Sequence, residues 1–224
     1  MATKKTDVVE IRPLDIRKVN ITLVGDTPLI MHKWSEKAKR EMLEAQQGKS
    51  KGKKKESKNP VADFIHSMYW LDNEPQITSD MSEEDCEKAF NEAIEKGARF
   101  GFQATAFKKS TINSAYRNGN SKDKVSIQGA FFVEADENGL VEIKSDVPIM
   151  REDMVKIGMG TADLRYRGQF NNWHADITLT YNANGPYSLE NIISMINMGG
   201  YTCGVGEWRV EKGGQNGMFH VKTN

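Results

Sequence analysis

The chain has 224 residues, of which 38% are hydrophobic and 28% are charged, a balance typical of a soluble globular protein and not of a disordered chain. No run approaches the roughly 20 apolar residues of a membrane helix, and the N-terminus lacks the apolar stretch of a signal peptide, so we expect a cytoplasmic protein. The formal net charge of zero argues against a uniformly basic protein that coats nucleic acid, but basic and acidic segments could still give the molecule two faces.

The cysteines and histidines form no recognisable metal or redox motif. Cys86 and Cys203 lie far apart without a CxxC pair, and the four histidines show neither HExxH nor HxH spacing. We therefore expect no disulfide, no metal site and no cofactor.

The chain is predicted to begin with a loose polar arm at 1–17. Val19, Ile21 and Leu23 then alternate with polar residues, which is the pattern of a half-buried strand, and the turn residues of 25–28 end it.

A basic insertion is predicted at 34–80. It comprises a polar helix from a Ser35 cap to Gln47, a solvated lysine-rich loop at 48–58 and a hairpin of two strands at 61–79.

Two helices follow this insertion. The first starts at a sequence that resembles a capping box, 82–85, and continues to Ala98 with apolar residues at helical spacing. The second spans about 104–117 and carries Lys108 and Lys109 on its outer side, where they are candidate contacts for nucleic acid.

A second insertion is expected at 118–150, with strands at 127–134 and 140–144 and a turn between them. An extended stretch beyond it and a strand at 173–181 are predicted to form one long hairpin around a turn at 171–172.

The last helix is predicted to run from a Ser188 cap to Met198, and Gly199 and Gly200 are expected to end it. A glycine-rich loop then leads into a final strand at 217–222.

Without the insertions, the predicted order is strand, helix, strand, strand, helix, strand. This order predicts an α+β fold with an elaborated ferredoxin-like core, in a single domain at 18–224. Many RNA-binding modules share this plan, but so do proteins of unrelated activity.

The glycine-rich segment, 204–217, is the first candidate for function. Glycines at Gly204 and Gly206 let a backbone approach a ligand closely and offer amide groups to anionic oxygens, while Trp208 and Arg209 supply a stacking face and a phosphate contact. The alternative is a glycine-rich turn with a core tryptophan.

A pair of arginines near the middle of a predicted strand is the second candidate. Arg165 and Arg167 share one face because side chains alternate, and we expect them to contact phosphates beside the aromatic rings of Phe170 and Trp173. The alternative is an exposed strand face paired with acids.

Two further groups complete the candidate nucleic-acid contacts. The lysine-rich loop, with Lys53, Lys54 and Lys55 at its centre, would attract a polyanion without sequence preference, or is simply a solvated loop. His32 and Lys33 follow the first strand, and His32 contacts a ligand or acts as a general acid or base with Lys33 or Tyr69. No catalytic set is specified by spacing, so we assign no catalytic residue.

Three segments in the same order resemble a family of bacteriophage proteins of mostly unassigned function: VGDTPLIMHKW, LRYRGQFNNW and GVGEWRVEKGGQNGMFHV. More distantly, the predicted plan and the glycine-rich loop resemble the RAMP superfamily, which includes CRISPR backbone proteins and repeat-processing endoribonucleases. The resemblance implies that single-stranded nucleic acid runs across the sheet and the glycine-rich loop, with subunits stacked along it. Glu207 and Trp208 depart from the arginine-rich residues common in that loop.

We therefore expect a non-enzymatic, phage-type protein that binds single-stranded DNA or RNA with little sequence preference, as a homo-oligomer along the strand, in the cytoplasm of a host cell. Two alternatives stay open. One is a metal-independent ribonuclease that uses His32, and the other is a protein-interaction factor that acts on a host defence or CRISPR complex.

Overall fold

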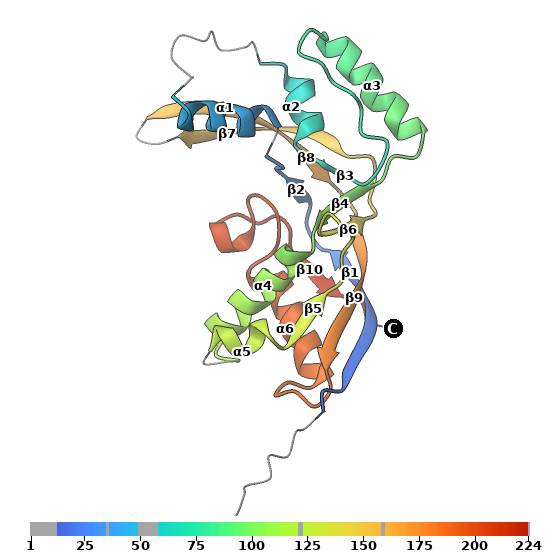
Figure 1. The fold of residues 1–224 in the computed structure, drawn as a ribbon, viewed down its shortest axis with the longest axis vertical. Coiled ribbons are helices and arrows are strands. Elements are labelled where there is room, and N and C mark those ends of the chain that lie inside the picture. The colour runs from blue at the N-terminus through green and yellow to red at the C-terminus, as the bar shows by residue number, and fades with distance from the viewer. Residues whose placement is uncertain (1–12, 35, 49–57, 121–122, 158–159, 224) are drawn as a thin grey trace, which may run out of the picture.

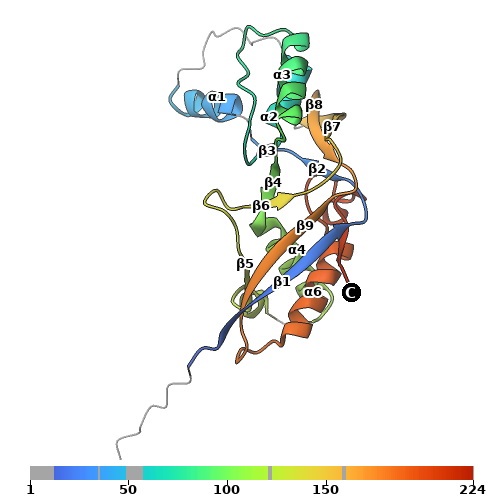
Figure 2. The same cartoon turned by 90° about the vertical axis from the view of Figure 1, so that its right-hand side faces the viewer.

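The computed structural model of the chain describes residues 13–34, 36–48, 58–120, 123–157 and 160–223. A four-stranded antiparallel sheet occupies the lower half of the elongated molecule in Figure 1. Two helices, α4 (Ala104–Arg117) and α6 (Leu189–Thr202), pack against each other on one side of it, as Figure 2 shows. In spatial order its strands are β10 (Phe219–Val221), β1 (Ile16–Gly25), β9 (His174–Asn182) and β5 (Phe131–Val133).

A second, three-stranded sheet lies in the upper half and carries the features discussed below. Its strands are β2 (Leu29–Met31), β8 (Thr161–Phe170) and β7 (Ile149–Ile157), in that order. Helix α2 (Pro60–His66) packs on β8, and Ser67 just beyond it accepts a hydrogen bond from the Gly168 amide through its hydroxyl, at 2.9 Å.

The remaining elements connect these two parts. A small sheet between them contains β3 (Tyr69–Trp70), β4 (Phe100–Gln103) and β6 (Leu140–Ile143). The other helices are α1 (Glu36–Gln46), α3 (Glu83–Glu95), α5 (Lys124–Gln128) and a 3-10 turn at Val210–Lys212.

One hydrophobic core extends through both halves. It includes the fully buried Trp173, which packs against the rings of Phe107 and Phe219 and donates its indole hydrogen to the Thr27 carbonyl at 2.8 Å. Helices and antiparallel sheets around this core make the fold α+β, as the sequence predicts. No helix in the described ranges is both long and apolar enough to cross a membrane.

Most predicted helices are confirmed. Helix α1 ends within one residue of the expected boundary, and α3 begins at the predicted capping box, in which Ser82 and Asp85 cap each other's backbone amides. Helix α4 matches the predicted 104–117. Strand β1 is also confirmed, although it begins at Ile16, inside the segment expected to be a loose arm.

Five predictions about elements are wrong. Residues 61–66 are helical in α2 and not a strand, and α5 overlaps the start of the strand expected at 127–134. The segments 127–134 and 140–144 do not pair, because β5 joins β9 while β6 joins β4.

The other two errors concern the last third of the chain. The long hairpin is formed by β7 with β8, whereas β9 belongs to the other sheet and pairs with β1. Helix α6 does not stop at Gly199 and Gly200 but continues to Thr202.

Candidate functional site

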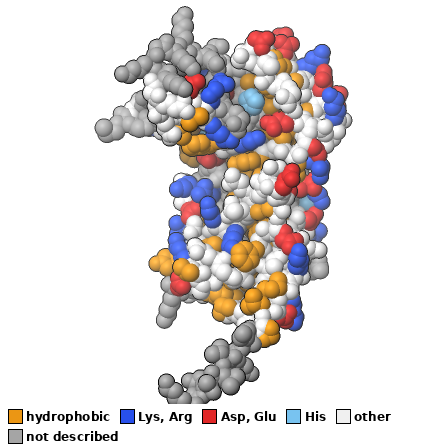
Figure 3. Space-filling view, viewed as in Figure 1, with side chains coloured by type: hydrophobic (Ala, Val, Ile, Leu, Met, Phe, Trp, Pro, Cys, Tyr) orange, Lys and Arg blue, Asp and Glu red, His pale blue; other side chains and the backbone are white. Residues whose placement is uncertain are grey.

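A cavity of about 420 Å³ opens between α1, α2, the end of β2 and the β7–β8 hairpin. We call it the basic cavity. Figure 3 shows basic side chains gathered around a histidine in this part of the molecule. Its polar and aromatic lining comes from two arginines, one lysine, two histidines and four other residues: Arg165, Arg167, Lys33, His32, His66, Trp34, Tyr166, Ser67 and Asp63.

The chain reaches this cavity directly from the core. Leu29, Ile30 and Met31 are fully buried in β2, so the next three residues, 32–34, leave the core at the cavity wall. The Lys33 amide donates to the Ser67 carbonyl at 2.8 Å, which fixes this segment beside the end of α2.

Alternation along β8 brings its two arginines to the same wall. In the β7–β8 register, Arg165 is opposite Asp153 and Arg167 is opposite Arg151, so these four side chains share one face of the hairpin. The prediction that Arg165 and Arg167 project together therefore agrees with the strand register.

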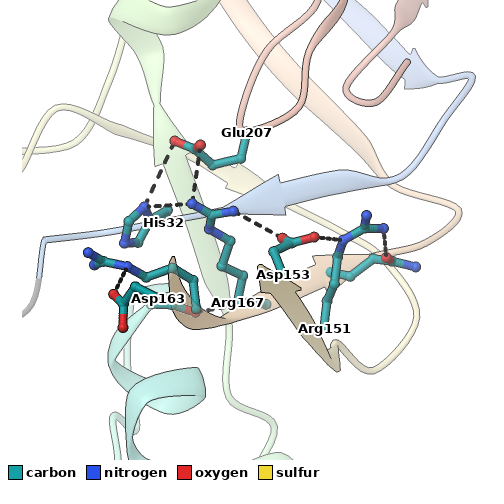
Figure 4. A network of polar contacts seen from close by, with 10 residues as sticks. His32, Arg151, Asp153, Asp163, Arg167 and Glu207 are labelled. Atoms are coloured by element: carbon teal, nitrogen blue, oxygen red, sulfur yellow. Dashed lines mark hydrogen bonds and ion pairs between the residues drawn. The ribbon is translucent and has the colours of Figure 1, made fainter. Parts of the chain in front are cut away.

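Arg167 lies at the centre of a buried polar network (Figure 4). Its side chain contacts Asp153 at 3.0 Å and Glu207 at 3.5 Å, and Asp153 also accepts a hydrogen bond from Arg151 at 2.8 Å. Arg167 is 4% exposed and Asp153 is 6% exposed. Although Asp153 is buried, its pKa is lowered by hydrogen bonds from Arg151, Arg167 and Trp208, which outweigh desolvation. The expectation that Arg167 contacts phosphates from the surface is wrong, because its charge is used inside the protein.

One donor of this guanidinium has no acceptor. Arg167 Nε is buried and makes no hydrogen bond with any described residue. A buried donor left without a partner costs about 1–3 kcal/mol, and an exception of this kind is typical of sites completed by water or a ligand.

His32 contacts the same network from the cavity side. Its Nδ1 lies 3.5 Å from an Arg167 terminal nitrogen and 4.0 Å from a Glu207 oxygen. Because a guanidinium only donates, Nδ1 must accept, which leaves the proton of the neutral ring on Nε2. Burial lowers the pKa of His32, as do Arg167 and Arg165, while Glu207 opposes them.

This lowered pKa predicts a dependence of stability on pH. The unfolded chain, with a histidine pKa of roughly 6.5, binds more protons than the folded chain between that value and the lower folded pKa of His32. The free energy of unfolding should therefore fall as the pH drops below about 6.5, by at most about 1.4 kcal/mol per pH unit from this group. Urea denaturation across this range checks it: His32→Gln should flatten the slope, and an unchanged slope would contradict the assignment.

Three residues of the basic cavity keep groups that a ligand can reach. Trp34 is 56% exposed. Arg165 contacts Asp163 through Nε at 2.8 Å, and its side chain is partly exposed. Lys33 lies 3.8 Å from Glu74, beyond hydrogen-bonding distance.

A second cavity, of about 260 Å³, lies on the other side of His32 and Glu207. The candidates that line it are His32, Tyr69, Lys109, Gly204, Gly206 and Arg209. Burial, and then Glu207, raises the pKa of Tyr69. Arg209 contacts Glu211 at 3.2 Å and donates to the Gly206 carbonyl at 3.0 Å, so it contributes little free charge.

Most amides of the glycine-rich segment donate within the protein, among them that of Gly204, which donates to the Gly199 carbonyl at 3.0 Å. The amides of Val205, Glu207 and Gly217 donate to carbonyls of Gly217, Ile30 and Pro28, at 2.8–2.9 Å. Gly217 has a φ of 66°, and a Cβ there would lie 1.7 Å from the Val205 carbonyl oxygen. The glycines therefore serve close backbone packing that holds Glu207 beside Arg167 and His32.

Other predicted contacts lie away from both cavities. Phe170 and Trp173 are enclosed by the core, so neither ring can stack on a base, and that prediction is wrong. Lys108 lies 3.9 Å from the centre of the Phe132 ring, outside either cavity lining. Lys53, Lys54 and Lys55 lie outside the described residues.

Sequence reasoning missed four residues of this region. Trp34 could have been found, because an aromatic residue directly follows His32 and Lys33. Asp153, His66 and Glu207 come together with the others only through tertiary packing. Within the described ranges, no three His, Cys, Asp or Glu side chains gather as they would around a metal ion.

Trp208 is the remaining predicted contact. Its φ of 51° is unusual for a residue with a side chain. The ring is partly exposed, and its contribution to the lowered pKa of Asp153 ties it to the Arg167 network. No protein-family model matches the chain, and the search of curated proteins finds no match either.

Proposed function

We propose that the protein binds single-stranded nucleic acid at the basic cavity, with little preference for sequence. The observation that carries this proposal is the exposed Trp34 ring in the same cavity lining as Lys33 and Arg165. An aromatic face for a base beside cations for the backbone is the combination on which sequence-tolerant single-strand binding depends.

The connectivity of the chain adds support. The lysine-rich segment joins α1 to α2, and both helices contribute residues to the basic cavity. Its lysines are therefore joined along the chain to two helices that line the cavity, and they would add attraction that depends on salt but not on sequence.

The open face of the four-stranded sheet is a weaker candidate for the path of the nucleic acid. Its central residues are small and polar, and they bond to one another: Thr22 with Asp176 at 2.6 Å and Thr178 with Asn20 at 2.8 Å. A sheet that stacks bases needs aromatic side chains at such positions. We therefore propose that the nucleic acid binds at the basic cavity and not on this sheet.

We also propose that the lower half is a ferredoxin-like core. The support is the strand order β10-β1-β9-β5, with α4 between β1 and β5 along the chain and α6 between β9 and β10. The similarity to phage proteins and to the RAMP superfamily stays a prediction.

Two substitutions test the binding proposal. Trp34→Ala should weaken binding by about tenfold, since stacking on one base contributes about 1–3 kcal/mol. Arg165→Ala should weaken binding of all sequences alike and reduce the slope of log affinity against log salt by about 0.7. Fluorescence anisotropy with labelled single-stranded DNA and RNA, over a series of salt concentrations, measures both.

Matched controls exist on the same chain. Arg17, like Arg165, contacts an aspartate two residues earlier, but it lies at the opposite end of the molecule, near the start of β1. Tyr201 is an exposed aromatic residue of α6. Arg17→Ala and Tyr201→Ala should leave affinity unchanged, and equal losses in the controls and the cavity variants would refute a site at the basic cavity.

A second candidate function is RNA cleavage in the second cavity. His32, Tyr69 and Lys109 line that cavity together, and the lowered pKa of His32 keeps it neutral, as a general base requires. Incubation of the protein with labelled RNA in the presence of EDTA distinguishes cleavage from binding. Cleavage that His32→Ala abolishes would favour the enzyme, whereas bound but intact RNA would favour the binding protein.

A further inference from the structure

Strand β7 is an open edge of the upper sheet. It pairs with β8 over nine residues, Ile149–Ile157, and no described strand pairs with its other side. An edge of this length presents a row of unpaired backbone donors and acceptors, which another strand can satisfy.

One face of the hairpin carries an exposed apolar pair near its middle. Met154 is opposite Leu164 in the register of the hairpin, and the two side chains are 67% and 41% exposed. Most monomeric proteins protect a long edge with short strands or dense charge. Strand β7 also carries four charged residues among its nine, yet the exposed Met154 lies at its middle, beside Leu164 of β8.

The charges along β7 are placed symmetrically around Met154. Glu152 lies two residues before it and Lys156 two residues after it, and both are exposed. Residues at even spacing on a strand share one face, so Glu152, Met154 and Lys156 project together.

We propose that β7 pairs with β7 of a second copy of this chain, antiparallel, about a two-fold axis at Met154. In this register Met154 meets the partner's Met154, and Glu152 meets the partner's Lys156 on both sides of the axis. The result is a continuous six-stranded sheet across the dimer. The contact is self-complementary, as a two-fold interface must be.

One neighbouring register is disfavoured by the charge of Asp153. An axis at Asp153 would place this carboxylate directly opposite its own copy, and like charges in that position are destabilising. With the axis at Met154, Asp153 instead faces the partner's Val155. The charges of β7 thus favour an axis at Met154 over an axis at Asp153.

This dimer does not require nucleic acid and does not rest on the proposed function. Sedimentation velocity of the full chain, freed of nucleic acid as judged by its absorbance ratio, should show twice the mass of one chain over a wide concentration range. Glu152→Lys places two lysines opposite each other at both pairs, and Lys156→Glu does the same with carboxylates. Each should weaken dimerisation by about tenfold or more.

Mixing variants with exchanged charges distinguishes the loss of this interface from a folding defect. The Glu152→Lys chain mixed with the Lys156→Glu chain restores both opposite-charge pairs, so the mixture should form a one-to-one heterodimer. The Glu152→Lys/Lys156→Glu double variant should dimerise with itself. Lys88→Glu, an exposed reversal on α3, is the matched control and should leave the dimer intact.

The result that would overturn the proposal is a wild-type chain that stays monomeric at every concentration. A dimer that neither single reversal weakens would overturn it as well. Circular dichroism verifies that each variant is folded, and a folded variant pair that fails to form the heterodimer contradicts the register. Nucleic-acid affinity, measured separately, can fail without affecting any of these outcomes.

Discussion

Arg167→Ala should lower the free energy of unfolding by about 3 kcal/mol, near the lower end of the roughly 3–5 kcal/mol expected when one partner of a buried ion pair is removed. The substitution leaves Asp153 charged and 6% exposed, with Arg151 as its remaining cation at 2.8 Å. It also removes a hydrogen-bond donor from His32 and a cation from Glu207. Equilibrium denaturation with urea measures the change.

Arg165→Ala is the matched control for this prediction. Arg165 is two residues away on the same strand, is partly exposed and pairs with the partly exposed Asp163. Pairs of this kind contribute roughly 0–1 kcal/mol. If the two variants lose the same stability, the buried network does not stabilise the fold. A double variant with Asp153→Asn should recover part of the loss of Arg167→Ala, because the uncompensated charge is removed.

Because Arg165 is partly exposed and Arg167 is buried, we expect the two arginines to have different roles. Arg165 can contact a ligand, whereas Arg167 positions Glu207 and His32 between the two cavities. Loss of binding in Arg167→Ala would therefore come with loss of stability. Of the two arginine variants, only Arg165→Ala is expected to change affinity and salt dependence while the fold stays intact.

Gly200→Ala is expected to destabilise the protein by about 3 kcal/mol, at the upper end of the usual cost of overpacking. In an exposed helix the same change would stabilise by about 1 kcal/mol, because alanine is the better helix former. In α6, however, a Cβ at this position would lie 1.9 Å from the Phe219 carbonyl oxygen of β10. The strand or the helix would have to move.

Gly129→Ala provides the comparison. Gly129 caps α5 with a right-handed backbone, and a Cβ there would meet no atom within 4 Å. This variant should be neutral within about 0.5 kcal/mol, as surface changes usually are. Thermal or urea denaturation of both variants checks the pair. A neutral Gly200→Ala would contradict the close approach of α6 to β10.

The contact between Gly200 and β10 also explains why the end of α6 was predicted too early from the sequence. Two adjacent glycines usually end a helix, since they cost backbone entropy and favour a left-handed cap. Here Gly199 lies against the backbone of Thr111 in α4, and Gly200 lies against β10. Close packing on both sides overrides the local preference, and nothing in the local sequence reports it.

Helix α2 was misread for a different reason. A short apolar run such as 61–66 fits a buried strand or a buried helix equally well. The signal that distinguishes them is at its start, where Asn59 caps the Ala62 amide at 3.0 Å and Pro60 occupies the first turn. Asparagine followed by proline is a favourable beginning for a helix.

The candidate site was predicted in part. His32, Lys33, Arg165 and Arg167 were identified from local patterns, and all four line the basic cavity. Phe170 was assigned to the same site in error, although its position already indicated otherwise. It lies three residues from Arg167, and an odd spacing places it on the opposite face of β8.

The sequence by itself determined the α+β class, the capped helices and the alternation that brings Arg165 and Arg167 to one face, because these depend on neighbours within a few residues. Only the tertiary structure decided which strands pair, that Arg167 is buried against Asp153, and that Trp34 faces a cavity. Burial and pairing depend on residues more than a hundred positions apart, such as His32 and Arg167. Local periodicity carries no information about which of these distant partners will meet.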